Sequence, residues 1–164
     1  MIKGVIFDLD GTLIYLPIDY EALFKELQRI MKTSNVTPLV QTIAVLDHET
    51  RSEVEKVWTQ AELEALPDLE INNDGMKLYQ KFSLNPLALV TMQSRKIVEE
   101  ILRTLKLSFN VIITREESLD RARQIDVAVA RLGLKPKEVL VIGDRESDRD
   151  SSQRIGCQFL KVMK

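Results

Sequence analysis

The sequence has few of the residues on which several kinds of catalytic and metal site depend. It contains one cysteine, Cys157, and one histidine, His48, among 164 residues. One cysteine excludes an intrachain disulfide, a CxxC redox pair and a cysteine-rich zinc site. One histidine excludes zinc sites that need two. There is no GxSxG motif for a serine nucleophile, and the 6 glycines form no nucleotide-binding glycine motif. Catalysis is therefore expected to use carboxylates, hydroxyls and basic side chains, with a hard metal ion.

Long apolar runs and an excess of one charge are also absent. The chain has 23 Lys+Arg against 25 Asp+Glu, a formal net charge of -2. No overall field attracts nucleic acid or anionic lipid, and no run of about 18 apolar residues could span a membrane. Acidic residues follow the N-terminus too soon for a signal peptide. We therefore expect a cytoplasmic protein with no nucleic-acid or membrane partner.

Short apolar runs without polar alternation predict strands that are buried on both faces. Helical patterns separate most of these runs, as is typical of a doubly wound parallel α/β sheet. In such sheets ligands bind at the carboxyl ends of the strands. The five predicted strands cover residues 4–9, 87–92, 109–114, 139–143 and 158–162.

The predicted helices of this sheet begin and end at recognisable residues. Ser94 and Ser118 can each cap the helix that follows, and Gly133 can end the second one. A short last helix is predicted over 148–155.

Residues 17–85 do not fit the alternation of strands and helices. Apolar stripes at helical spacing over 20–31 and 54–66 predict two helices there. The segment has 7 basic and 12 acidic residues. We expect an α/β core domain of residues 1–16 and 86–164, with a small helical cap inserted at 17–85.

Two pairs of aspartates follow predicted strands. Asp8 and Asp10 end the first strand, and because side chains alternate along a strand, both carboxylates can project toward one site. Asp144 and Asp148 follow the fourth strand. Mg²⁺ is usually held by a few carboxylates together with water and substrate phosphate, so we predict that these four residues bind Mg²⁺. The alternatives are solvated acids at a strand end and caps of the last helix.

Three motifs together resemble a known family. They are DLDGTL at 8–13, the apolar strand that ends at Thr91, and Gly143-Asp144-x-x-x-Asp148. Their order and topology are similar to those of the haloacid dehalogenase (HAD) superfamily, over residues 1–16 and 86–164. The insert resembles the cap that closes over the site and selects substrates in many members.

The resemblance implies a role for each of these residues. Asp8 corresponds to the nucleophile that forms an aspartyl-phosphate in the family's phosphatases, and Asp10 to the general acid/base. Thr91 corresponds to the hydroxyl that binds the phosphoryl group, and Asp144 and Asp148 to the acids of the Mg²⁺ site. This set suits phosphoryl transfer, which needs a nucleophile, charge neutralisation and a proton for the leaving oxygen.

The sequence departs from the family at the lysine expected near the start of the helix between the third and fourth strands. No lysine lies between Lys106 and Lys135. Arg121 falls in the first turn of that helix and is our candidate, since a guanidinium holds phosphate oxygens well. The alternative is that Arg121, like Arg123, is an ordinary solvated helix residue.

Three functions remain open. The first is a Mg²⁺-dependent hydrolase of phosphomonoesters, similar to phosphoglycolate phosphatases and acting on a small phosphorylated metabolite through an aspartyl-phosphate. The second is a catalytically impaired binding or regulatory protein with the HAD fold, suggested by the missing lysine. The third is a haloacid dehalogenase, which Asp10 argues against because a halide leaves without an acid.

Overall fold

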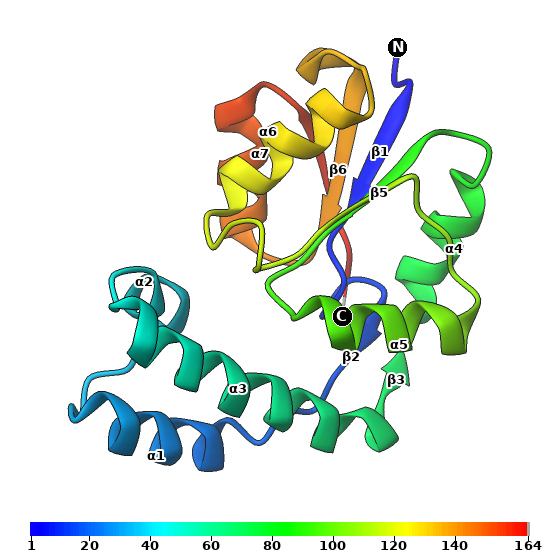
Figure 1. Ribbon diagram of the computed structural model, residues 1–164. Helices are drawn as coiled ribbons and strands as arrows, with labels where there is room; N and C mark the ends of the chain where they lie inside the picture. Colours follow the sequence, from blue (N-terminus) through cyan, green and yellow to red (C-terminus); the bar gives the residue numbers. More distant parts are fainter. Residues whose placement is uncertain (164) are drawn as a thin grey trace. The chain divides into compact units, whose positions relative to one another are not determined.

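The computed structural model describes residues 1–163, which form two compact units (Figure 1). The first unit combines Met1–Tyr15 with the chain from Leu69 onward, and the second is Leu16–Asp68. No helix in the described part of the chain is both long and apolar enough to span a bilayer.

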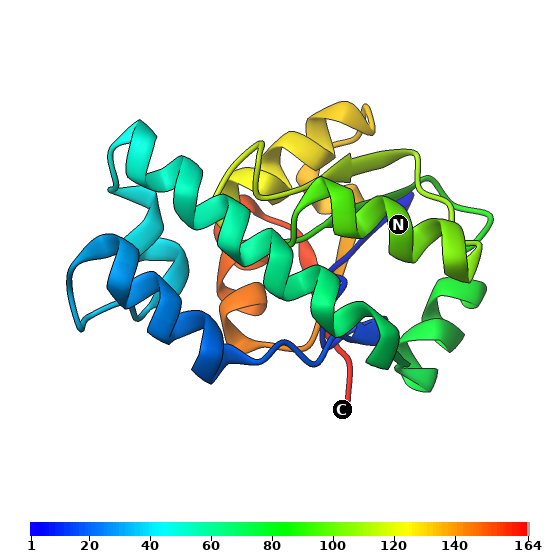
Figure 2. The ribbon, with the colours of Figure 1, turned by 60° about the horizontal axis from the view of Figure 1, so that its bottom comes forward.

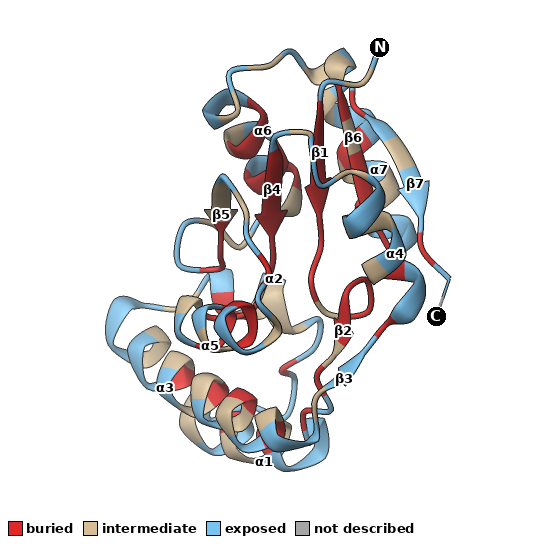
Figure 3. Ribbon diagram, turned by 90° about the vertical axis from the view of Figure 1, so that its right-hand side faces the viewer, coloured by how far each residue is buried: buried red, intermediate tan, exposed pale blue. Residues whose placement is uncertain are grey.

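A five-stranded parallel sheet forms the centre of the first unit. Its strand order is β5-β4-β1-β6-β7, so β1 lies between β4 and β6. The strands are β1 (Gly4–Phe7), β4 (Leu87–Val90), β5 (Val111–Ile113), β6 (Val139–Gly143) and β7 (Gln158–Lys161). This confirms the predicted five-stranded, doubly wound sheet. The buried strands at its centre are visible in Figure 3.

Helices cover both faces of this sheet, as right-handed crossovers in two opposite directions require. Helices α4 (Asn73–Lys81) and α5 (Arg95–Leu105) lie on one face, and α6 (Arg121–Arg131) and α7 (Glu146–Ile155) on the other (Figure 1). Successive side chains of β1 point to opposite faces of the sheet. Ile6 belongs to the apolar cluster that includes Ile125 of α6, whereas the ring of Phe7 lies 6.2 Å from that of Tyr79 in α4.

One predicted cap is wrong. Helix α6 is capped by Asp120, whose carboxylate accepts the backbone N–H of Ala122 at 3.1 Å. The Ser118 hydroxyl instead accepts the N–H of Asp120 at 3.0 Å. Ser118 therefore forms the turn before the helix. The predicted cap of α5 is confirmed, because Ser94 accepts from the N–H of Ile97.

The second unit is helical. It contains α1 (Tyr20–Met31), α2 (Leu39–Ala44), α3 (His48–Ala65) and the short 3₁₀ helix η1 (Leu66–Asp68). Helices α1 and α3 pack side by side (Figure 2). The apolar stripes predicted these two helices, but α2 has only 6 residues and no side-chain cap.

The sequence placed residues 69–85 in the insert, but the structure groups them with the sheet. Strand β3 (Glu70–Ile71) pairs with β2 (Ile14–Tyr15). Asn72, which caps α4, donates its backbone N–H to Leu13 O at 2.9 Å and its side-chain amide to Gly11 O at 3.3 Å. Helix α4 therefore supports the turn that directly follows Asp8 and Asp10.

Gly75 of helix α4 lies close to this turn. A Cβ atom added there would lie 1.7 Å from the carbonyl oxygen of Thr12. Glycine-to-alanine replacement inside a helix normally stabilises it by about 1 kcal/mol. We expect Gly75→Ala instead to lower the melting temperature by about 4 °C or more, because the turn must move.

Thermal unfolding of Gly75→Ala and of Lys77→Ala, an exposed position on the same helix, tests this close contact. Lys77→Ala should change stability by no more than about 0.5 kcal/mol. A melting temperature that is unchanged or higher in Gly75→Ala would contradict the packing of α4 on the turn.

Candidate active site

Three carboxylates converge where neighbouring strands of the sheet end. Asp8 follows β1, Asp144 follows β6, and Asp148 lies in the first turn of α7. Each offers an oxygen atom within 4.8 Å of the other two, and all three residues are buried. Because β1 and β6 are adjacent and parallel, their carboxyl ends bring Asp8 and Asp144 together.

The turn after β1 is shaped around one of these carboxylates. Gly11 has a φ angle of +85°, and a Cβ atom there would lie 2.3 Å from Oδ2 of Asp144. Glycine is therefore required both by the left-handed backbone and by the close carboxylate. The Thr12 hydroxyl donates to Oδ1 of Asp144 at 3.2 Å. The run that carries Asp8 thus also orients Asp144.

The two carboxylate oxygens of Asp148 have different partners. Its Oδ2 accepts the backbone N–H of Arg145 at 3.3 Å, which caps the start of α7. Its Oδ1 lies 3.3 Å from Nε of Arg121. The same carboxylate therefore caps the helix and faces the acidic group.

Arg121 brings a positive charge to this group of carboxylates. It is the first residue of α6, and its Nη2 donates to Oδ1 of Asp8 at 3.2 Å. The guanidinium therefore bridges Asp8 and Asp148, and its side chain is 16% exposed. Arg123, two residues further along the helix, is exposed. Arg95 forms an ion pair with Glu117.

Thr91 lies in the turn after β4. Its hydroxyl accepts the backbone N–H of Gln93 at 3.1 Å, and the residue is 1% exposed. The carbonyl oxygen of Thr91 accepts a hydrogen bond from the side chain of Gln124, whose Oε1 accepts from Nη1 of Arg121. Sequence reasoning missed Gln124. It could have been recognised in the sequence as a polar residue on the apolar face of the helix, one turn before Ala128.

Asp10 is not one of the three residues whose carboxylate oxygens lie within 4.8 Å of one another. It is half-buried, and its side chain lies outside the group that Asp8, Asp144 and Asp148 form. The structure thus brings together three of the four aspartates predicted from the sequence as metal ligands.

Burial dominates the electrostatics of Asp8. Loss of solvation raises the pKa of its carboxyl to about 7. The Arg121 guanidinium opposes this shift, whereas Asp148 and Asp144 add to it. The Asp8 carboxylate therefore needs more positive charge nearby to be fully ionised in neutral solution.

The donor set fits a hard divalent cation. Three carboxylates are the type of oxygen ligand that Mg²⁺ prefers, and Arg121 offsets only one of their negative charges. The space that Gly11 leaves for Asp144 keeps this carboxylate close to the turn after β1. Asp8, Asp144 and Asp148 are therefore the residues that could hold such an ion.

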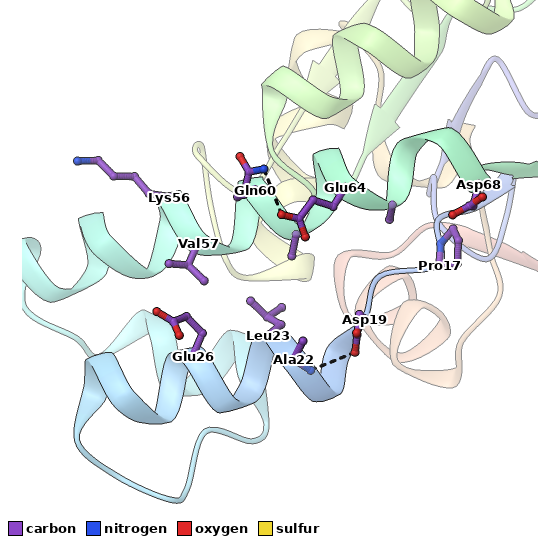
Figure 4. A pocket seen from close by; sticks show the side chains of 12 residues that line it. Pro17, Asp19, Ala22, Leu23, Glu26, Lys56, Val57, Gln60, Glu64 and Asp68 are labelled. Carbon is purple, nitrogen blue, oxygen red and sulfur yellow. Dashed lines mark hydrogen bonds between the residues drawn. The ribbon is translucent and has the colours of Figure 1, made fainter.

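A groove also lies within the helical unit, between α1 and α3 (Figure 4). Its volume is about 550 Å³. Apolar side chains such as Leu23 and Val57 line it together with acids such as Glu26 and Glu64. Glu64 accepts a hydrogen bond from Gln60 at 3.2 Å. None of these groups is arranged as a nucleophile with a base.

The pKa of Asp8 predicts how the stability of the metal-free protein depends on pH. An acid whose pKa is about 7 in the folded protein and has its ordinary value of 3.8 in the unfolded chain binds more protons in the folded state between these values. The free energy of unfolding should therefore fall as pH rises from about 4 to 7, and the loss should persist above pH 7. Asp8→Asn removes this penalty.

We expect metal-free Asp8→Asn to melt at least about 2 °C above the wild type at pH 8 and to lose this advantage near pH 4. Thermal unfolding in a chelator at both pH values checks this. Asp150→Asn, on the exposed side of α7, should follow the wild type. If Asp8→Asn were less stable than the wild type at pH 8, the burial penalty on Asp8 would be wrong.

Comparisons with known proteins agree with this geometry. A family model described as haloacid dehalogenase-like hydrolase matches residues 5–162. Pyrophosphatase PpaX from Oceanobacillus iheyensis is 26% identical over 183 residues, covering 98% of this chain and 83% of the relative.

Solved structures share the fold at low identity. A haloacid dehalogenase-like hydrolase from Streptococcus pneumoniae has a TM-score of 0.73 and 21% identity, covering 99% of this chain and 85% of the other. A protein assigned as a phosphoglycolate phosphatase from Lactobacillus plantarum has a TM-score of 0.73 and 19% identity, covering 97% and 86%. Because the family model spans nearly the whole sequence, the chain belongs to the haloacid dehalogenase-like hydrolases, as its motifs predicted.

Proposed function

We propose that this hydrolase is a Mg²⁺-dependent phosphatase that cleaves phosphomonoesters of small metabolites in the cytoplasm through an aspartyl-phosphate on Asp8. The observation that carries the proposal is the position of Asp8, which is buried between two further carboxylates and the guanidinium of Arg121. The names of the Oceanobacillus and Lactobacillus proteins, a pyrophosphatase and a phosphoglycolate phosphatase, also point to substrates with phosphoryl groups.

In this mechanism an oxygen of Asp8 attacks phosphorus in line with the leaving oxygen. The new O–P bond forms as the bond to the leaving group breaks, and Asp10 donates a proton to the leaving oxygen. Asp10 then removes a proton from water, which attacks the phosphoryl group and regenerates Asp8. Asp10 lies outside the group of three acids, which suits a residue that must exchange protons.

The remaining residues bind and orient the phosphoryl group. Arg121 and the hydroxyl of Thr91 contact its oxygens in the proposed mechanism. Asp8, Asp144 and Asp148 would hold Mg²⁺, which would supply positive charge that favours the ionised form of Asp8 and neutralises phosphoryl oxygens. The sequence predicted Asp10 both as a metal ligand and as the general acid/base. We propose only the acid/base role for its side chain.

Arg121 and Asp10 favour the phosphatase over the other two functions. The missing lysine suggested an impaired binding protein, but a guanidinium 3.2 Å from Asp8 provides a cation at the nucleophile. A dehalogenase would have no use for Asp10 as an acid.

We also propose that the helical unit Leu16–Asp68 acts as the cap and selects the leaving group.

The function is tested on a panel of phosphoglycolate, sugar phosphates, p-nitrophenyl phosphate and pyrophosphate, with Mg²⁺ or with a chelator. We expect phosphate release that depends on Mg²⁺. Asp8→Asn should reduce it at least about 1,000-fold, because it removes the nucleophile, whereas Asp150→Asn should remain close to the wild type.

Different failures have different meanings. Near wild-type rates in Asp8→Asn would exclude the aspartyl-phosphate. Binding of phosphate esters without turnover would favour the impaired protein, and halide release from haloacids would favour the dehalogenase. If pyrophosphate were the only compound hydrolysed, the proposal that the substrates are phosphomonoesters would be wrong.

The role of Arg121 gives a separate prediction. Arg121→Ala should lower kcat about 100- to 1,000-fold, because loss of a charged donor to the transition state costs about 3 to 4 kcal/mol. Arg123→Ala, on the exposed side of the same helix, should remain within about twofold of the wild type. Steady-state kinetics on one ester measure both. Equal effects of the two substitutions would show that Arg121 is not the phosphoryl cation.

A further inference from the structure

We propose that Gln124 is a positioning residue, which fixes the plane of the Arg121 guanidinium and ties it to the backbone of Thr91. This inference rests on the proposed function, in which Arg121 and Thr91 contact the phosphoryl group. It identifies a buried hydrogen-bonded link between these two residues.

The guanidinium of Arg121 has three nitrogens, and each has a different partner. Nη2 lies 3.2 Å from Asp8, and Nε lies 3.3 Å from Asp148. Nη1, which contacts neither carboxylate in these two pairs, donates to Oε1 of Gln124 at 3.2 Å. The three contacts define the plane of the guanidinium, because its donors are fixed in one fork.

Gln124 is itself held rigidly. Its Nε2 donates to the carbonyl oxygens of Thr91 and Ser118, both at 2.9 Å. The residue is 0% exposed. Two carbonyl acceptors on one side and a guanidinium donor on the other specify the orientation of the amide. Gln124 therefore connects the end of β4, the turn before α6 and the cation of the site.

The need for such a residue follows from the use of arginine at this place. A lysine ammonium is a compact charge that donates in any direction, whereas a guanidinium must be oriented to present its donors. Arg121 and Gln124 are spaced i, i+3 on α6 and so lie on one face of the helix. The pair supplies both a charge and a defined direction. This pairing can therefore replace the single lysine that the family resemblance led us to expect.

The test is a double-mutant cycle with Gln124→Met, which keeps the length of the side chain but removes its amide, and with Arg121→Ala. We expect Gln124→Met to lower kcat/KM about 10- to 100-fold, because small displacements of a positioned group are costly. In the Arg121→Ala background the same change should have at most about a twofold effect.

Val129→Ala is the matched structural control. Val129 is buried in the same helix and is 3% exposed, so truncation leaves a cavity without touching Arg121. It should lower the melting temperature and leave kcat/KM unchanged at a temperature where the variant is folded. Equal losses of kcat/KM in both backgrounds, or a comparable loss in Val129→Ala, would show that Gln124 merely packs.

Two further measurements keep the outcome decisive. If Gln124→Met does not fold, Gln124→Glu replaces it. The activity of Gln124→Glu relative to the wild type should rise as pH falls, because a protonated carboxyl regains a donor. A relative activity that does not change with pH would contradict the proposal.

If neither the wild type nor any variant hydrolyses phosphate esters, the proposed function fails. The cycle is then measured by thermal unfolding of the metal-free proteins, where additive changes would overturn the link between Gln124 and Arg121.

Discussion

The site depends on the burial of several like charges at one edge of a sheet. Three carboxylates within 4.8 Å of one another are costly to ionise in a buried place, and this cost raises the pKa of Asp8 to about 7. A fold has no need of such a group for stability. Cations must offset the cost, and Arg121 supplies one positive charge beside Asp8 and Asp148.

The surrounding structure is arranged to keep these charges together. Parallel pairing of β1 with β6 places Asp8 beside Asp144. The left-handed turn at Gly11 leaves room for the second carboxylate, and α4 packs on that turn. Asp148 satisfies the start of α7 while it faces Arg121. The same few residues thus satisfy local backbone requirements and form the buried acidic group.

Much of this could be predicted from the sequence. Buried apolar runs predicted five strands, although most end one or two residues earlier than expected. After β1 and β4 the chain turns at once into the segments that carry Asp8 and Thr91. Asp8, Asp144 and Asp148 were found because parallel strand ends converge. The grouping of 69–85 with the sheet was missed, since these residues contact segments distant in sequence, as in the pairing of β3 with β2 and the approach of Gly75 to Thr12. Gln124 was missed for a similar reason, because its side-chain amide bonds to the carbonyl oxygen of Thr91, which is distant in sequence.

The central claim is that Asp8 is the nucleophile of this acidic group. Rapid acid quenching during turnover of a phosphate ester, followed by mass spectrometry of the peptides, tests it most directly. The account predicts one acid-stable, base-labile phosphoryl group on Asp8, present in the wild type and absent from Asp8→Asn. A phosphoryl group on Asp10 or on another residue, or none during measurable turnover with Mg²⁺, would contradict it.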